Sequence, residues 1–376
     1  MTESLTEVQR EMRTVCRRFL ADHAPAALVR EADGFDRTLW SRLVHELGVT
    51  ALRAPEEVGG HGAGVLDMAL FFEEAGRALA PVPLLASVGM ATVTLVHVGP
   101  EAHPWLARLL AGEETWSAVL GDDGSALSDS EAHLEASRAG SSWHLRGDAP
   151  LVLDGDVAER LLVPARLDTG HELGLFVVSG HSATRRSGLD LTRRLARVSF
   201  DGAEVEPLTV GPTRPARLRA AIREARVYAA AEMIGAGQWA IDTAVNYAST
   251  RVQFGQPIGA FQAVKHLLVS RAVELRSARA TVHAAASALD SDEEADLLVR
   301  SGVVAAARAA VQATGDAIQV LGGIGFTWEH DAHLYLRRAM SDRAIFDAEA
   351  VRASLLAPFG LKGYGRTAPD SVRPAS

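Results

Sequence analysis

The sequence has little that would place the protein outside a reducing cytoplasm. Its 376 residues include one cysteine, Cys16, which excludes a disulfide framework and a cysteine-based metal site. No run approaches the roughly 20 apolar residues of a membrane span, and residues 1–20 lack the apolar core of a signal peptide. We therefore expect a cytoplasmic protein without a membrane partner.

Basic residues are scarce relative to acidic ones. The chain has 38 lysines and arginines against 47 aspartates and glutamates, which gives a net charge of −9. Phosphate-rich partners attract basic surfaces, so this balance argues against binding to nucleic acid. Hydrophobic residues make up 48% of the chain, a proportion typical of a soluble globular protein. The length predicts two or three domains in one compact body.

Hydrophobic spacing predicts a mainly α fold with a central β domain. Apolar residues recur every three or four positions in 1–112, which indicates an N-terminal α-helical domain. Short β-prone runs in 113–210 predict an antiparallel barrel or sandwich. Long helical patterns then predict a C-terminal four-helix bundle within 215–366, followed by a flexible tail at 367–376. The expected bundle helices are 215–250, 258–289, 293–321 and 331–357.

The stretch YASTRVQFGQPIGAFQAVKH, residues 247–266, joins the first two bundle helices. Gly255 and Pro257 are expected to end a helix and to let a ligand approach the backbone. Arg251 lies one turn earlier and offers the fork of donors that suits a diphosphate. The segment also supplies a ring and two amides, from Phe254, Gln253 and Gln262. Together these groups predict a binding site for a diphosphate.

A second candidate segment, QVLGGIGFTWEH at 319–330, follows the third bundle helix. Gly322 and Gly323 lie at a helix C-terminus, where the dipole repels anions, so a phosphate there needs their backbone N–H groups. Gln319 adds an amide. The alternative is that the glycines only cap the helix and that Arg251 forms a surface ion pair. The order of the two segments on neighbouring helices favours a shared site.

In these two segments the sequence resembles the acyl-CoA dehydrogenase family of flavoproteins. YASTRVQFGQPIGAFQAVKH is similar to the family's Arg-x-x-Phe-Gly segment, and QVLGGIGFTWEH to its Gln-x-x-Gly-Gly segment. The similarity extends over residues 35–350 and includes LGVTALRAPEEVGGHGAG and WHLRGDAPLVLDGDVAERLLVPA. The resemblance implies an N-terminal helical domain, a middle antiparallel β-barrel and a C-terminal four-helix bundle, assembled as a tetramer.

The resemblance also implies FAD, bound between domains at a subunit interface. The family contacts its diphosphate and adenine side across that interface, and the matching residues here are Arg251, Gln253, Phe254, Gln262, Gln319, Gly322 and Gly323. On the flavin-ring side, Leu151 and Leu153 replace the family's tryptophan and hydroxyl residue. LGDDGS at 120–125 replaces its Thr-Glu-Pro-Gly loop. The contacts to a neighbour's FAD are therefore complete, whereas the ring contacts are depleted.

The catalytic position departs further from the family. Desaturation of an acyl thioester needs a carboxylate that removes the α-proton while the flavin accepts the β-hydride. The two places where the family carries this glutamate correspond to Phe346 and Ala225. Asp347 and Glu224 stand one residue away, but one residue turns a helical side chain by about 100°. We therefore expect surface or helix-capping carboxylates there, and the catalytic residue stays unassigned.

The resemblance implies an acyl-CoA dehydrogenase-like oxidoreductase of fatty acid or lipid metabolism, acting on an acyl-CoA or other acyl thioester. The chain resembles the base-lacking subunit of heteromeric actinobacterial members of the family. That resemblance implies a subunit that lends FAD contacts to a base-carrying paralogue in a heterotetramer, with electron transfer flavoprotein as acceptor. One alternative is a self-sufficient homotetramer with Asp347 or Glu224 as a displaced base. Others are a flavin-dependent monooxygenase or a non-dehydrogenating enzyme on the same scaffold, and a structural subunit with no ligand of its own. The acyl chain is not specified by any motif.

Two further groups of polar residues are interpreted as structural. Glu329, His330 and His333 share a helix face, as metal ligands do, but are expected to form caps and hydrogen bonds between helices. Five arginines lie in SATRRSG and TRRLARVSF of the β region. We expect them at solvated strand edges rather than in a site for the phosphates of CoA.

Overall fold

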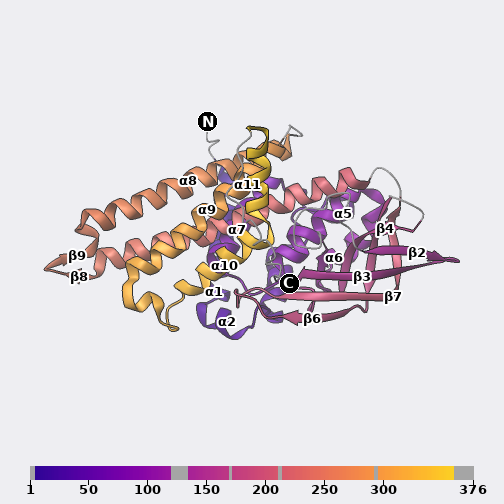
Figure 1. Cartoon of the computed structure of the whole chain (residues 1–376), viewed down its shortest axis with the longest axis horizontal. Helices are drawn as coiled ribbons and strands as arrows, with labels where there is room; N and C mark the ends of the chain where they lie inside the picture. The colour runs from indigo at the N-terminus through magenta and orange to yellow at the C-terminus, as the bar shows by residue number, and fades with distance from the viewer. Residues whose placement is uncertain (1–4, 120–133, 169–171, 211–213, 292–294, 360–376) are drawn as a thin grey trace, which may run out of the picture.

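The computed structural model describes residues 5–119, 134–168, 172–210, 214–291 and 295–359. Figure 1 shows an elongated molecule with long helices at one end and the strands at the other. Helices come first and last along the chain, and all described strands except the short β8 and β9 lie between them. The predicted fold class, mainly α with a central β domain, is confirmed.

The first described region folds into helices, as its apolar spacing predicts. They are α1 (Glu7–His23), α2 (Ala26–Glu31), α3 (Arg37–Leu47), α4 (Val65–Ala78), the π-helical segment η2 (Leu84–Thr92), α5 (Val93–Val98) and α6 (His103–Leu110). The ends of α3 follow from two residues. The carboxylate of Asp36 accepts from the backbone N–H of Leu39 at 2.6 Å, and Gly48 ends the helix in the left-handed conformation.

The strands form a closed barrel. They are β1 (Trp116–Ala118), β2 (Glu135–Ala139), β3 (Ser142–Leu153), β4 (Arg160–Leu167), β5 (Leu173–Ser179), β6 (Ser182–Arg186) and β7 (Leu195–Val210). Pairing runs from β4 through β2, β3, β7 and β5 back to β4, with β1 beside β4 and β6 beside β7. Most pairs are antiparallel, as predicted, but β1 and β2 pair with β4 in parallel. Apolar side chains such as Val163, Phe176 and Val198 fill the interior.

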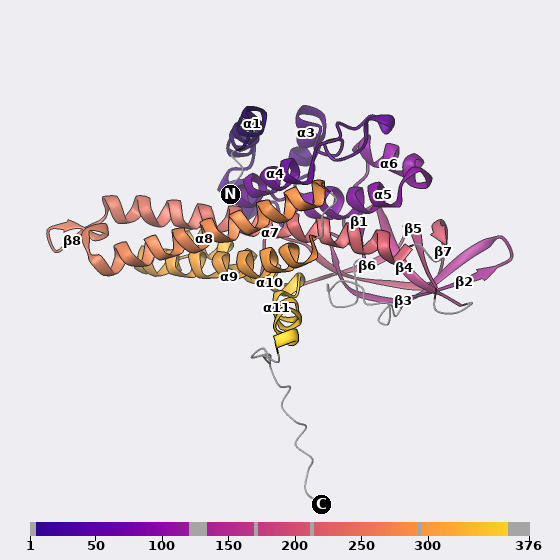
Figure 2. The ribbon, with the colours of Figure 1, turned by 90° about the horizontal axis from the view of Figure 1, so that it is seen from above.

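The C-terminal region is built on long helices that lie side by side (Figure 2). They are α7 (Arg214–Thr250), α8 (Gln262–Asp290), α9 (Asp296–Leu321) and α10 (Ala332–Ile345), followed by α11 (Ala348–Leu356). The prediction of one helix over 331–357 is wrong, because Asp347 takes a φ of 42° and breaks it. Within the described part of the chain, none of the helices combines the length and apolar character that a membrane span requires.

Two glycines let α4 of the N-terminal region pack directly against α7 of the bundle. A Cβ at Gly76 would lie 2.1 Å from the carbonyl oxygen of Glu232, and one at Gly235 would lie 1.9 Å from that of Glu73. Any larger residue would push the two helices apart, because the interior is closely packed. The apolar core consequently runs without interruption from α4 into α7 and β1.

Candidate functional site

A short β-hairpin with a two-residue turn joins α7 to α8 where a helix break was predicted. The helix itself ends at Thr250, and β8 (Val252–Gln253) then pairs with β9 (Gln256–Pro257). Phe254 and Gly255 form the turn with φ values of 52° and 80°, as in a type I′ turn. Phenylalanine rarely adopts this backbone conformation, yet Phe254 does so with 93% of its surface exposed. Folding alone gives no reason for a phenylalanine at this point.

The glycine segment lies at the same end of the bundle. One apolar cluster contains Ala248 of α7, Leu268 of α8 and Val320 of α9, and Ile258 packs against it. The end of α7, the start of α8 and the end of α9 therefore meet there, and Figure 1 shows the hairpin projecting from this end. We call residues 251–262 and 319–326 the bundle tip. Its predicted contact residues are exposed, with Gly322 partly so: Arg251, Gln253, Phe254, Gln262, Gln319, Gly322 and Gly323.

Arg251 combines a fixed backbone with a free side chain. Its N–H donates to the carbonyl of Tyr247, and its own carbonyl accepts from Ile258, both at 2.8 Å. The guanidinium has no hydrogen bond or ion pair with any other residue in the described ranges, so the alternative of a surface ion pair is not observed there. Free donors on a fixed stem fit a diphosphate.

Gly322 has a structural role in the fold, whereas Gly323 does not. Gly322 ends α9 with a φ of 63°, and its N–H donates to the carbonyls of Ile318 and Gln319. It is therefore a helix cap, as the alternative interpretation expected. Gly323 is exposed, and a Cβ there would meet no atom within 4 Å. No described residue requires a glycine at 323, and its backbone is open to approach by a ligand such as FAD.

Both positions that match the family's catalytic glutamate are apolar and buried. Ala225 on α7 is 1% exposed, and Phe346 at the end of α10 is 2% exposed. They belong to one apolar core cluster together with Leu153 and Tyr228. A general base must stand within hydrogen-bonding distance of the proton that it removes. Neither position supplies one.

Glu224 is not the surface carboxylate that we expected; it is 2% exposed. Arg53 donates to both of its oxygens, at 2.6 and 3.2 Å. His97 Nε2 lies 2.8 Å from Oε2, and the Tyr228 hydroxyl donates to Oε1 at 2.5 Å. Burial alone would raise the pKa of Glu224, but the His97 hydrogen bond and the charge of Arg53 outweigh it and lower the pKa to about 2. Such a carboxylate is a weak proton acceptor.

Asp347 fulfils the prediction of a helix-capping carboxylate. Its side chain accepts from the backbone N–H of Ala350 at 3.1 Å, at the start of α11. The residue is partly exposed and has the left-handed backbone described above. The carboxylate therefore has a structural role that explains its presence.

The residues that match the flavin-ring contacts are also held within the fold. Leu153 is buried in the main core and Leu151 packs against it. Asp154, which follows at the family's asparagine-glycine turn, has a φ of 52° and is 3% exposed. Burial raises the pKa of Asp154 to about 7 against the opposing charges of Arg193 and Arg338. The LGDDGS loop at 120–125 lies outside the described residues.

The expectation of solvated strand edges is wrong for Arg193. Its side chain is 5% exposed and pairs with Glu232 of α7 at 2.8 Å and with Asp342 of α10 at 3.1 Å. Arg338 of α10 lies in the same buried group and donates to Asp190 at 2.6 Å. The contact of Arg338 with Asp190 spans 148 residues of sequence and joins the segment between β6 and β7 to the bundle, a separation that no local pattern reports.

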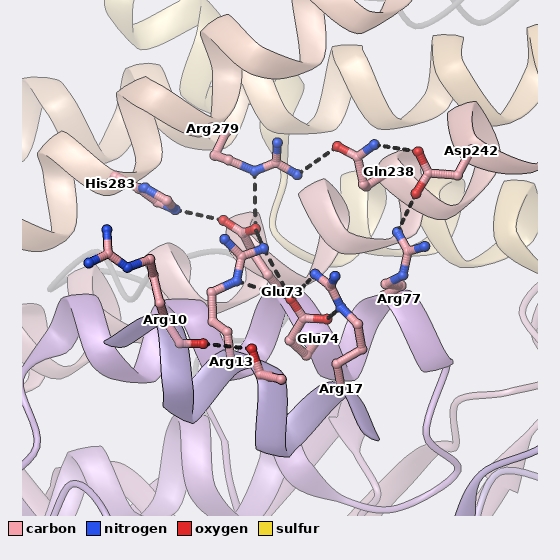
Figure 3. Close-up of polar contacts among 11 residues, drawn as sticks. Arg10, Arg13, Arg17, Glu73, Glu74, Arg77, Gln238, Asp242, Arg279 and His283 are labelled. Carbon is pink, nitrogen blue, oxygen red and sulfur yellow. Dashed lines mark hydrogen bonds and ion pairs between the residues drawn. The ribbon is translucent and has the colours of Figure 1, made fainter. Parts of the chain in front are cut away.

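Glu73 and Glu74 of α4 are further buried carboxylates, 1% and 2% exposed (Figure 3). Arg17 donates to both oxygens of Glu74 at 2.8 Å. Glu73 accepts from Arg279 at 3.1 Å, and His283 Nε2 lies 2.6 Å from it. The pair ties α1, α4 and α8 together and leaves neither carboxylate free to act as a base.

The histidines near the tip have structural partners. His330 Nδ1 accepts from the backbone N–H of Ala332 at 3.1 Å, which confirms a cap at the start of α10. The ring of His333 stacks on Trp328 with centroids 4.6 Å apart. Both ring nitrogens of His333 are buried without a hydrogen-bond partner among the described residues, so the expected hydrogen bond between helices is not observed for His333.

Comparison with known families matches both helical regions. A family model described as acyl-CoA dehydrogenase, C-terminal domain, matches residues 216–357, and one described as acyl-CoA dehydrogenase, N-terminal domain, matches residues 6–113. The chain is 33% identical to acyl-CoA dehydrogenase IpdE2 of Mycobacterium tuberculosis over 346 residues, which cover 91% of this chain and 94% of IpdE2.

Two solved structures extend the comparison to the whole fold. One is a variant of the steroid ACAD Tcur3481–Tcur3483, with 26% identity and a TM-score of 0.82 over 94% of this chain and 98% of that one. The other is the ChsE4–ChsE5 complex of Mycobacterium tuberculosis, with 26% identity and a TM-score of 0.84 over 96% of this chain and 99% of that one.

Proposed function

Because this chain belongs to the acyl-CoA dehydrogenase family of FAD-dependent oxidoreductases, we propose that it lends FAD contacts to a partner chain and takes no proton itself. One observation carries the proposal. A full set of contact residues is exposed at the bundle tip, whereas Ala225 and Phe346 fill both base positions with buried apolar groups. A self-sufficient dehydrogenase needs both functions in the same chain.

In this proposal the tip holds the diphosphate side of FAD that lies mainly on the partner. Arg251 supplies a charged fork, and the open backbone of Gly323 allows close approach. Phe254 offers an exposed ring for stacking. The chemistry that bound FAD would supply is acceptance of the hydride in the α,β-desaturation. The proton is removed by a carboxylate of the partner, and electron transfer flavoprotein is the proposed final acceptor.

The similarity to ChsE4–ChsE5, which is described as a complex of two components, supports a heteromeric assembly. Tcur3481–Tcur3483 also carries a two-part name and is described as a steroid ACAD. We therefore propose a heterotetramer with a base-carrying paralogue. An acyl-CoA attached to a steroid is the first substrate to test.

The surroundings of the neighbouring carboxylates weigh against the self-sufficient alternative. Glu224 has both oxygens engaged by Arg53 and a pKa of about 2, and Asp347 caps α11. Using either as a base would break contacts that stabilise the fold. The monooxygenase and the non-dehydrogenating enzyme need no such base, so flavin content and reactivity must separate them from the proposal.

The test is to purify the chain alone and with each base-carrying family member of the same genome, and then to count FAD per chain. We expect little FAD on the chain alone, and one FAD per pair of chains in a complex that acyl-CoA bleaches. One tightly bound FAD per chain in a homo-oligomer, bleached by acyl-CoA, would refute the proposal. A yellow chain that oxidises NAD(P)H with oxygen would instead support the monooxygenase.

A further inference from the structure

A contact from the N-terminal region reaches the loop behind the glycine segment. Arg30, on the short helix α2, donates from Nη1 to the carbonyl of Trp328 at 2.6 Å. It also donates from Nε and Nη2 to Oδ1 of Asp331, at 3.0 and 2.6 Å. These partners lie about 300 residues away in sequence, between the 3-10 segment η5 (Gly322–Phe326) and α10. Arg30 therefore holds both the backbone and a side chain of this loop.

The role of Asp331 shows that this contact replaces an ordinary helix cap. Aspartate at the N-cap position usually accepts from a backbone N–H of the first turn. At the start of α10 its side chain makes no such bond and is directed to Arg30 instead. The nearby N–H of Ala332 donates to His330 Nδ1. Asp331 thus links two regions of the molecule rather than stabilising its own helix.

Packing beneath the loop is incomplete. A cavity of about 230 Å³ lies between α1, α2, α4, α7 and α10, and Asp331 is part of its lining. Other lining side chains are Ala26, Val29, Leu79, Trp239 and Tyr335. Asp331 is the residue of this loop that borders the cavity, which is large enough to hold water, so close-packed side chains do not fix the loop on that side. The Arg30 fork then carries more of the restraint.

We infer that Arg30 is a positioning residue for the FAD contact of the bundle tip, an inference that rests on the proposed function. By fixing Trp328 and Asp331, it holds the segment that begins at Gly322 in one conformation before FAD arrives. A preformed segment loses less conformational entropy on binding. The N-terminal region of this chain thereby influences the affinity of a cofactor seated mainly on another chain.

The restraint can be tested first on this chain alone, without FAD or partner. Arg30→Gln removes the charge and the fork, whereas Arg30→Lys keeps the charge but cannot make the three bonds together. We expect the rate of hydrogen exchange in peptides covering 322–331 to rise about tenfold or more in both variants. A tenfold rise corresponds to a loss of about 1.4 kcal/mol in the local stability of this segment. Arg18→Gln, an exposed change on α1, is the control. Unchanged exchange in Arg30→Gln would overturn the inference.

The second measurement is the affinity for FAD of the purified assembly that contains this chain. We expect Arg30→Gln to weaken FAD binding about tenfold, with little rescue by Arg30→Lys and no change in Arg18→Gln. Arg251→Ala in the same assembly distinguishes the positioning role of Arg30 from the proposed function of the bundle tip. If Arg251→Ala weakens FAD binding but Arg30→Gln does not, the positioning role is refuted and the proposed function stands. If neither variant changes FAD binding, both are refuted.

Discussion

The bundle tip and the buried centre around Glu224 differ in how far the fold accounts for their residues. At the centre, Glu224 is surrounded by donors, and Ala225 and Phe346 complete an apolar core. At the tip, the guanidinium of Arg251 has no partner among the residues that the structure describes, and Phe254 is exposed with a left-handed backbone.

The difference between the two regions follows from solvation. Burying a carboxylate without partners costs several kcal/mol. A position in the interior that needs no free base is therefore occupied by a paired carboxylate or by an apolar residue. Exposed donors are satisfied by water at little cost. Variants at the centre should therefore change stability, and variants at the tip should change cofactor binding.

The largest effect is expected from Glu224→Ala. It leaves the Arg53 charge and the Tyr228 hydroxyl without their partner in the interior, which should lower the free energy of unfolding by about 3–5 kcal/mol. Glu46→Ala, the control, removes an exposed partner of Arg42 and should change the free energy of unfolding far less. Urea unfolding of the isolated chain measures both. A loss of turnover in the complex with no loss of stability would instead make Glu224 a catalytic base.

Arg251→Ala should produce the converse result. Removing a charge-assisted fork from a diphosphate should weaken FAD binding by the complex about 100-fold. The free energy of unfolding of the isolated chain should stay within about 0.5 kcal/mol, because the guanidinium has no partner in the described ranges. Arg276→Ala is the matched control, because Arg276 is also exposed but lies on α8, outside the bundle tip. Equal FAD binding by Arg251→Ala and the control would remove the tip from the site.

The same comparison explains what the sequence predicted. Arg251, Gly322 and Gly323 lie in short motifs at helix ends, where residue type and local backbone are directly linked, and the structure brings these ends together. Their contact with FAD remains a proposal. The fold class also followed from periodicity, which records which face of each helix and strand is buried.

The errors concern contacts between distant parts of the chain. Glu224 pairs with Arg53, 171 residues away, and Arg193 is buried by α7 and α10. A charged residue on a helix or near a strand looks the same in sequence whether or not a distant partner covers it. The break at Asp347 is a separate, local error. Aspartate adopts the left-handed conformation less readily than glycine, so one aspartate in a helical pattern did not indicate a break.

A smaller effect, dependent on pH, is expected at Asp154. Its pKa of about 7 in the folded protein lies above its ordinary value of 3.8. Between these pH values the unfolded chain loses the proton and the folded chain keeps it, so stability falls as pH rises. An asparagine side chain cannot ionise, and asparagine tolerates the left-handed backbone. Asp154→Asn should therefore raise the free energy of unfolding by on the order of 2 kcal/mol at pH 8 and change it little below pH 4. Urea unfolding at the two pH values measures this. An equal gain at both pH values would contradict this account.

The smallest change in stability is expected from Gly323→Ala. Any effect of this variant on FAD binding at the tip can therefore be attributed to binding rather than to folding. A Cβ at 323 would meet no atom of the described residues within 4 Å, so the free energy of unfolding should change by less than about 0.5 kcal/mol. Gly322→Ala, one residue earlier, places alanine at a φ of 63° and should cost about 1 kcal/mol. If a ligand approaches the backbone here, Gly323→Ala weakens FAD binding by the complex several-fold despite its normal stability. Unchanged FAD binding would mean that the open backbone at 323 serves no cofactor, and that Arg251 alone supports the comparison.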